Sequence, residues 1–158
     1  MIKIKKMVVP VIIGGLAGSI AGMLFMNKKI EDKNKKVDKF KSYYNMLNQW
    51  LLLKQEGKTL EEYFVNNGYK NIAIYGMGEM GSRLYDELKN SNIKVKYAVD
   101  ENAEGIYSEI EVFGKKEEYP DVDVIIVTAI FEFDSIEKEL QKKIKFPVIA
   151  LDDVVYEI

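Results

Sequence analysis

A short apolar run that leads directly into three spaced glycines constrains the fold of this 158-residue chain more than any other feature. The run covers residues 71–75, and the segment that follows, residues 76–81, reads G-x-G-x-x-G. In this pattern the first glycine permits a tight turn, and the second lets a phosphate approach the backbone. The third lets a helix pack closely on the strand. The pattern therefore predicts a strand, a turn and a helix that together form a phosphate site.

The candidate binding residues lie in this turn and after two further predicted strands. Asp100 follows the apolar run 95–99 and lies 19 positions after Gly81 (100 − 81), where a dinucleotide-binding unit places the acid that binds ribose. Ligands of parallel α/β sheets lie beyond the carboxyl ends of the strands. The predicted cofactor-binding residues are therefore Gly76, Met77, Gly78, Glu79, Met80, Gly81, Asp100, Glu101, Asn102, Thr128 and Ala129.

Two acids bear on which ligand is preferred. The charge of Asp100 disfavours a 2′-phosphate, so we expect NAD or a nucleoside-diphosphate sugar rather than NADP. The structural alternative for Asp100 is a solvated strand end. Glu79 lies inside the phosphate turn, where its charge disfavours an anion unless its side chain points away. The sequence does not choose between NAD and a nucleotide sugar, because the turn contacts only phosphate and the acid only ribose.

Strands that alternate with helices predict an α/β fold for residues 69–158, the predicted nucleotide-binding domain. We expect a Rossmann-like, doubly wound parallel sheet of about five strands in the order 3-2-1-4-5. A last segment, Asp152-Asp153, is expected to begin a terminal turn. The predicted strands are 71–75, 94–99, a short one around 110–112, 122–128 and 147–151, and the predicted helices are 80–89 and 133–144.

An uncharged segment, residues 7–26, predicts a single membrane-spanning helix. Twenty residues of helix span about 30 Å, the thickness of a bilayer core. The apolar run continues up to Lys28 and Lys29, which favours an uncleaved anchor over a signal peptide. Residues 1–28 are therefore predicted to form a transmembrane anchor. Small residues that recur every four positions predict a possible homodimer contact within it, through Gly14, Gly18 and Gly22.

Residues 29–68 are predicted to form a juxtamembrane helical linker. Its aromatic and apolar residues, among them Phe40, Tyr44 and Trp50, fall on or near one helical face. We expect this face to pack on the domain or on a second copy. A capping box at residues 59–62 predicts the start of a second, short helix.

Composition excludes several kinds of site. The chain has no cysteine and no histidine, which removes disulfides, thiol catalysis and the commonest metal ligand and general base. No metal is expected. Lysine dominates the first 41 residues, so the rest of a chain with net charge −2 is acidic, and no nucleic-acid partner is expected. The lysines flanking the apolar segment favour a cytoplasmic domain only weakly. Nucleotide ligands, which are cytoplasmic metabolites, favour that location more strongly.

The segment from residue 71 to residue 152 resembles the nucleotide-binding Rossmann domains at the front of bacterial sugar-nucleotide epimerase/dehydratases and of sugar acyltransferases in surface-polysaccharide assembly. The resemblance rests on the run 74–78, Ile-Tyr-Gly-Met-Gly, with Glu79 next, and on the acidic pair Asp100-Glu101. It implies a bacterial membrane protein that is accessory to cell-surface polysaccharide biosynthesis.

Three functions remain open: a membrane-anchored nucleotide-binding module, a small enzyme that uses NAD or a nucleotide sugar, and a degenerate Rossmann domain that serves as a structural adaptor. We expect none of the catalytic domain that follows in the family, and no Tyr-x-x-x-Lys pair anywhere in the chain, so no proton relay of the short-chain dehydrogenase type. Together with the lack of histidine and cysteine, this favours binding over catalysis. Three glycines and Asp100 favour binding over a purely structural role.

Overall fold

The computed structural model describes residues 3–115 and 118–158, and the side chains of its first helix from Met23 onward, apart from residues 24 and 25. The chain divides into two units, Met1–Tyr44 and Asn45–Ile158. Helix α1 (Lys3–Gln55) contributes to both. The compact second unit thus begins well before residue 69, because the end of α1 and the segment after it bury apolar side chains in the domain.

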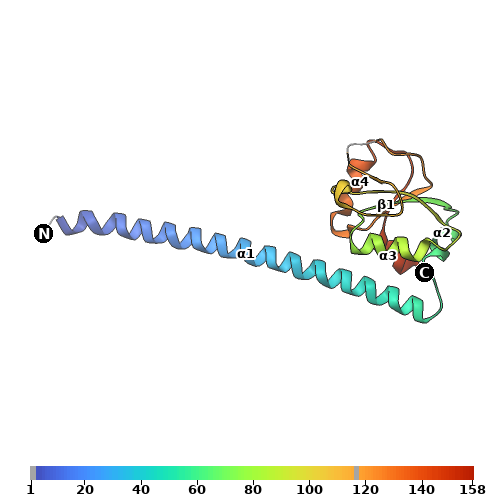
Figure 1. Ribbon diagram of the computed structural model, residues 1–158. Helices are drawn as coiled ribbons and strands as arrows, with labels where there is room; N and C mark the ends of the chain where they lie inside the picture. Colours follow the sequence, from blue (N-terminus) through green and yellow to red (C-terminus); the bar gives the residue numbers. More distant parts are fainter. Residues whose placement is uncertain (1–2, 116–117) are drawn as a thin grey trace. The chain divides into compact units, whose positions relative to one another are not determined.

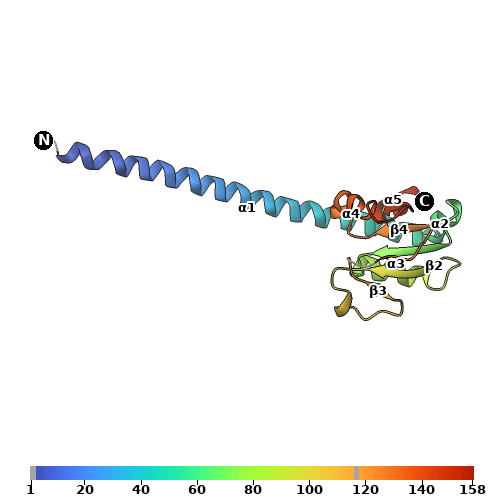
Figure 2. The same ribbon diagram turned by 90° about the horizontal axis from the view of Figure 1, so that it is seen from above.

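The second unit is built on a five-stranded sheet in which every strand pair is parallel, with the order β3-β2-β1-β4-β5. The predicted α/β class and strand order 3-2-1-4-5 are confirmed. Tyr75 lies opposite Val99 on one side and Val127 on the other, so three strands end at the same edge. Figure 2 shows β2 and β3 side by side. The strands are β1 (Asn71–Tyr75), β2 (Lys94–Val99), β3 (Val112–Phe113), β4 (Val124–Val127) and β5 (Val148–Ala150).

Helices cover both faces of the sheet. Helix α4 (Phe133–Leu140) lies on one face, and α3 (Glu79–Leu88) and α5 (Leu151–Glu157) lie on the other (Figure 1). The shorter elements are α2 (Glu61–Asn66) and two 3₁₀ turns, η1 (Ala103–Gly105) and η2 (Ile130–Glu132). The right-handed crossover rule explains this arrangement, since the chain moves outward from β1 first in one direction and then in the other.

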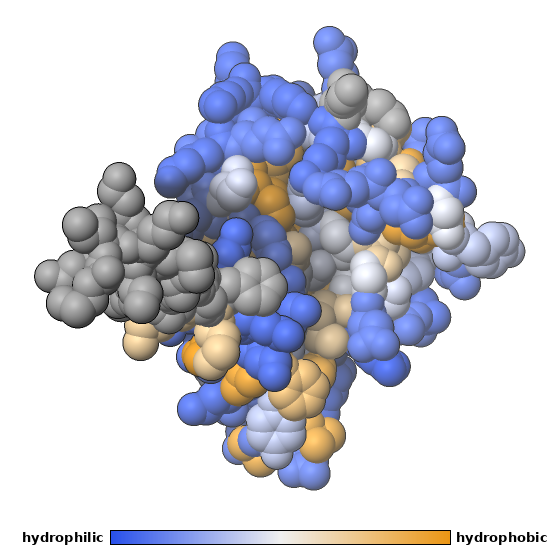
Figure 3. All heavy atoms as spheres, turned by 90° about the vertical axis from the view of Figure 1, so that its left-hand side faces the viewer, coloured by the Kyte–Doolittle hydropathy of each residue, from blue (hydrophilic) through white to orange (hydrophobic). Residues whose placement is uncertain are grey.

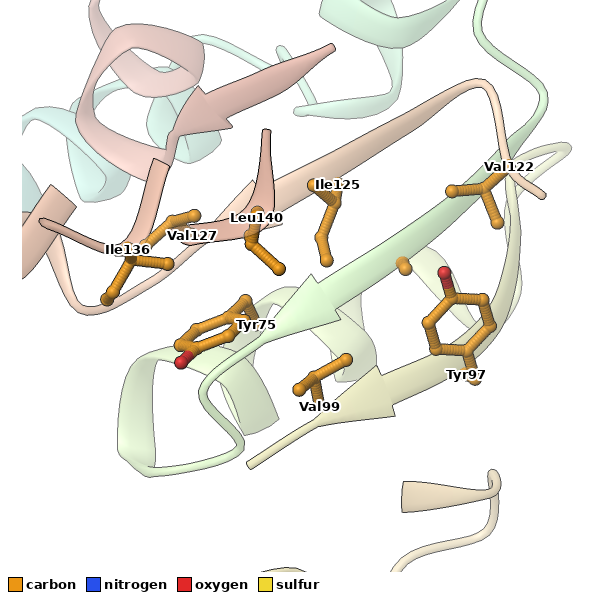
Figure 4. Close-up of a cluster of buried hydrophobic side chains, with 9 residues drawn as sticks. Tyr75, Tyr97, Val99, Val122, Ile125, Val127, Ile136 and Leu140 are labelled. Carbon is orange, nitrogen blue, oxygen red and sulfur yellow. The ribbon is translucent and has the colours of Figure 1, made fainter. Parts of the chain in front are cut away.

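The core under α4 is formed by alternate residues of the strands (Figure 4). Tyr75 and Tyr97 point to this face, and Ile136 and Leu140 of α4 pack against it. The intervening strand residue Ile74 points to the other face, toward α3. Strands β1 and β4 are buried on both faces, which explains why their sequences read as continuous apolar runs.

The last turns of α1 pack on the domain through a narrower face than the sequence predicted. Met46, Trp50 and Leu53 are buried, whereas Leu47 and Leu51 are exposed. The residues of the predicted aromatic stripe therefore lie on two faces of α1, and only one of these faces packs on the domain. After α1 ends at Gln55, the chain turns at Gly57, whose φ of 77° favours glycine.

Two local predictions need correction. The predicted terminal turn at Asp152-Asp153 is the first turn of helix α5, where acids are favoured because they face the positive end of the helix dipole. The predicted capping box forms in part: the Glu62 carboxylate accepts a hydrogen bond from the Thr59 N–H at 3.2 Å. The N-cap position belongs to Leu60, whose side chain is buried and makes no cap.

No helix in the described part of the chain is long and apolar enough to cross a bilayer. The predicted anchor at residues 7–26 and its glycines, Gly14, Gly18 and Gly22, lie outside the residues whose side chains are described, apart from Met23 and Met26.

Candidate functional site

The first glycine of the turn, Gly76, has a backbone conformation that other residues rarely adopt. Its φ is +93°, and a β-carbon placed on it would lie 2.7 Å from Oγ1 of Thr128. Its N–H continues the sheet by donating to the Val99 carbonyl at 2.8 Å. Gly76 therefore lets the chain leave β1 sharply while it stays bonded to β2.

The other two glycines have different surroundings. A β-carbon on Gly81 would lie 2.0 Å from the Gly76 carbonyl oxygen and 3.4 Å from the Ile74 side chain. A β-carbon on Gly78 would have no atom within 4 Å. Gly81 thus allows the close packing of helix on strand, and Gly78 leaves open space above the turn at the N-cap of α3. Each glycine meets the requirement that the G-x-G-x-x-G pattern assigns to it.

Asp100, the predicted ribose ligand, holds the turn in place. Its Oδ2 accepts a hydrogen bond from the Met77 N–H at 2.8 Å, and its Oδ1 accepts one from the Asn102 N–H at 2.9 Å. A carboxylate has about four acceptor positions, so both oxygens can accept further bonds from a ligand hydroxyl. The carboxylate is half-buried and lies beside the glycine turn.

Thr128 ties the end of β4 to the same turn. Its hydroxyl is buried and donates to the Gly76 carbonyl, with 2.7 Å between the oxygens. Its N–H donates to the Tyr75 carbonyl at 2.9 Å. The amide nitrogen of Ala129 would lie 3.8 Å from a β-carbon on Gly76. The structure therefore brings the ends of β1, β2 and β4 together, as predicted.

Three of the predicted site residues have additional or different surroundings. Glu79 is the exposed first residue of α3, in the turn whose free amides a phosphate would use. Glu101 forms an ion pair with Lys115, and its carboxylate is largely exposed. The exposed Asn102 side chain lies against Gly105. Met80, the second residue of α3, is half-buried.

Sequence reasoning missed a tyrosine and a lysine at the same edge of the sheet. The Tyr75 hydroxyl is buried and has no hydrogen-bond partner among the described atoms. The Lys115 ammonium lies 5.9 Å from the centroid of the Tyr75 ring. Burial raises the pKa of Tyr75, and Lys115 offsets part of this rise. The hydrogen bond to Glu101 raises the pKa of Lys115. At neutral pH the pair is therefore a neutral phenol beside an ammonium.

The position of Lys115 offered a signal that could have identified it. It lies two residues after the end of β3, beyond the carboxyl end of a strand, where ligands of such sheets bind. Its partner Tyr75 lies in the predicted strand 71–75 and in the run 74–78, but neither pattern assigns it a role in the site.

A hollow of about 210 Å³ lies beside the turn, between α3 and the segment that connects β2 to β3. It is too small for a whole dinucleotide, because ligand pockets usually measure about 300–1,000 Å³. One nucleobase is of the right size for it. Tyr107, at the edge of this hollow, is fully exposed, so the face of its ring is accessible to a base. The lining residues are Met77, Ser82, Tyr85, Asp86, Tyr107, Ser108 and Glu109.

The prediction that the chain has no Tyr-x-x-x-Lys pair is wrong. Tyr85, in α3, and Lys89, just after it, have this spacing. The Tyr85 hydroxyl donates to Glu109 at 3.1 Å, and Lys89 pairs with Asp86 at 2.7 Å. Burial and Glu109 raise the pKa of Tyr85. A proton relay needs the opposite shift, because the lysine must favour the phenolate. This pair lacks the electrostatics of such a relay.

Within residues 3–115 and 118–158, no three acidic side chains gather so that they could hold a metal ion. Comparisons with protein-family models, with curated proteins and with solved structures found no match.

Proposed function

We propose that this chain is a membrane-anchored nucleotide-binding protein whose ligand is NAD or a nucleoside-diphosphate sugar. The observation that carries the proposal is that the three glycines are needed for three different structural reasons. Gly76 has a positive φ, Gly81 lies against the Gly76 carbonyl, and Gly78 has open space beside it. Backbone conformation explains the first glycine and close packing the third, whereas open space at Gly78 is what a bound phosphate needs.

The remaining groups supply recognition of the ribose and the base. Asp100 lies beside the turn with acceptor capacity left for a ribose hydroxyl, and its charge repels a 2′-phosphate. The hollow beside Met77 and Tyr107 takes the base, which stacks on the exposed tyrosine ring. Lys115, at the same edge of the sheet, supplies the positive charge that the turn itself lacks.

The membrane part of the proposal rests on the sequence alone. Residues 7–26 form the single anchor, the domain is cytoplasmic, and the resemblance to sugar-nucleotide enzymes suggests an accessory role in bacterial cell-surface polysaccharide biosynthesis. The glycine stripe of Gly14, Gly18 and Gly22 allows two anchors to pair.

A ligand-free adaptor with a degenerate Rossmann core is the second candidate. One observation favours it: Asp100 already holds the Met77 amide, which is one of the donors that a ligand could use. The two candidates differ in whether the domain gains stability from a nucleotide. A ligand present at a hundredfold excess over its Kd stabilises a protein by about 2.7 kcal/mol, which a thermal shift detects.

The first prediction concerns Gly78. NAD, NADP, UDP-sugars, CoA and S-adenosylmethionine are screened by thermal shift against the full chain in detergent. Gly78→Val should abolish the shift given by the best ligand, because the side chain fills the space of the phosphate. The melting temperature without ligand should fall by only a few degrees, because valine is a poorer N-cap than glycine, whereas φ of −68° is open to other residues and a β-carbon there has no atom within 4 Å. A variant that binds as tightly as the parent in calorimetry would place the ligand elsewhere.

The second prediction concerns ligand selectivity at Asp100. Asp100→Asn keeps one acceptor oxygen for the turn but removes the negative charge. The preference for NAD over NADP, measured as a ratio of Kd values, should therefore fall by about tenfold, which corresponds to 1.4 kcal/mol. Glu104→Gln, an exposed acid in the same connection, is the matched control and should leave the ratio unchanged. An unchanged ratio in Asp100→Asn would show that Asp100 only holds the turn.

A further inference from the structure

Helix α1 carries an exposed apolar stripe with a strict seven-residue repeat. We call this stripe the seam. Tyr44, for example, is 62% exposed and Phe40 is 75% exposed. Figure 3, seen from the N-terminal side, shows several apolar side chains exposed below the grey atoms. The seam consists of Met23, Ile30, Val37, Tyr44 and Leu51, which follow one another at intervals of seven, and of Met26, Phe40 and Leu47, which each lie three positions after one of them.

The seam is not the face through which α1 packs on its own domain. That face is formed by Met46, Trp50 and Leu53, which are almost fully buried. In heptad notation, with Tyr44 at position a, these residues occupy positions c and g, whereas the seam occupies a and d. Among the described side chains, those of the seam therefore stay exposed while this other face is buried.

The repeat length indicates what kind of partner covers the seam. A straight α-helix drifts by about 20° per heptad relative to a strict repeat of seven, so the seam rotates by about 80° over four heptads. A flat surface, such as a bilayer or the face of a globular protein, is matched by a period of 3.6 instead. Only a second helix that supercoils around α1 stays in contact with a period of 3.5. The partner is therefore a helix with the same repeat.

We propose that the seam pairs with the seam of a second copy, in a parallel two-stranded coiled coil over residues 23–51. Eight exposed side chains at about 100 Å² each give about 800 Å² per chain, the area that one partner buries in a stable interface. The anchor of the proposed function holds both N-terminal ends in one membrane, so the parallel orientation rests on the proposed function. Pairing through the seam does not depend on the anchor.

The charges beside the seam predict a distinctive salt dependence. Lys33 occupies a d position, and Lys36 and Lys41 occupy the g and e positions that face each other across a parallel dimer. Like charges repel across this interface, and salt screens them. Pairing between two copies therefore strengthens as salt is added. Binding to an anionic lipid surface or an acidic protein weakens instead.

The first test is disulfide cross-linking of the full chain in isolated membranes, since the chain has no cysteine of its own. Val37→Cys and Tyr44→Cys place a thiol in the seam. Ser42→Cys, at the exposed f position, is the matched control. Mild oxidation should give at least about tenfold more dimer from the seam variants. Equal cross-linking at residue 42, or none at both seam positions, would overturn the proposal. Absence of the chain from the membrane fraction would contradict the anchor alone.

The second test is sedimentation of the full chain in detergent at low and high salt. All samples carry Gly18→Ile, so that pairing through the proposed glycine stripe does not contribute. Phe40→Lys should raise the dimer dissociation constant by at least about a hundredfold, and Ser42→Lys should change it little. High salt should tighten the parent dimer. A dimer that weakens with salt, or that tolerates Phe40→Lys, would contradict pairing through the seam.

Discussion

Replacing Gly81 with alanine is expected to destabilise the domain by at least about 3 kcal/mol, although it adds only one methyl group. The new β-carbon would lie 2.0 Å from the Gly76 carbonyl oxygen and 3.0 Å from its carbonyl carbon. These are backbone atoms, so no side-chain rotation relieves the clash. Gly76 is itself held by the Val99 carbonyl at 2.8 Å and by the Thr128 hydroxyl at 2.7 Å. Helix α3 must therefore move away from β1.

The free energy of unfolding is measured by urea titration of the full chain in detergent, with circular dichroism as the signal. In a thermal melt of the same samples, a loss of 3 kcal/mol lowers the melting temperature by roughly 10 °C in a domain of this size. Gly78→Ala is the matched control three residues earlier, and it should unfold like the parent because a β-carbon there meets no atom within 4 Å. If both variants were equally stable, the turn would be able to relax, and close packing at Gly81 would not be what requires the third glycine.

The order of the sheet could be predicted because its determinants are local. Buried runs such as 71–75 and 124–127 identify strands, and their alternation with helices leaves few topologies. Prediction was weaker where tertiary contacts decide. Strand β3 is only two residues long and is defined by its pairing with Ala98 and Val99. Helix α5, predicted only as a terminal turn at Asp152-Asp153, is stabilised by burial of Leu151, Val154 and Val155.

The candidate site shows the same division. The glycine turn and Asp100 are spaced along the sequence by the geometry of one strand, one helix and the next strand, so spacing was enough to bring them together. Tyr75 and Lys115 are 40 positions apart (115 − 75) and meet only because β3 pairs with β2. The pattern could not tell either which apolar face of α1 packs on the domain, since only the packing shows that Trp50 is buried and Leu51 is exposed.

The contact between α1 and the domain includes one buried acid, Glu87 of α3. Its side chain is only 7% exposed. It accepts hydrogen bonds from the Trp50 indole N–H at 2.6 Å and from the Leu60 N–H at 2.8 Å, and it pairs with Lys54 at 2.8 Å. The Leu60 N–H, at the start of α2, is one of the amides that have no acceptor within the helix itself. Glu87 therefore joins the end of α1 and the start of α2 to the helix that begins at the glycine turn.

Glu87→Leu is expected to cost about 3–5 kcal/mol, because two buried donors lose their acceptor at once. Trp50 and Leu60 are almost fully buried, so water cannot replace the carboxylate without opening the packing. Trp50 is the only tryptophan of the chain, so its fluorescence reports on this contact directly. We expect the emission to shift to longer wavelength in the variant and the urea midpoint to fall.

The matched control for Glu87→Leu is Lys54→Met, which removes the third partner. Lys54 is 43% exposed, so the ion pair competes with water and its loss should cost no more than about 1 kcal/mol. The Trp50 emission should stay as in the parent, because the indole N–H keeps its acceptor. If Lys54→Met were as damaging as Glu87→Leu, the ion pair would hold α1 to the domain. If neither variant changed the emission or the midpoint, apolar packing of Met46, Trp50 and Leu53 would be sufficient without Glu87.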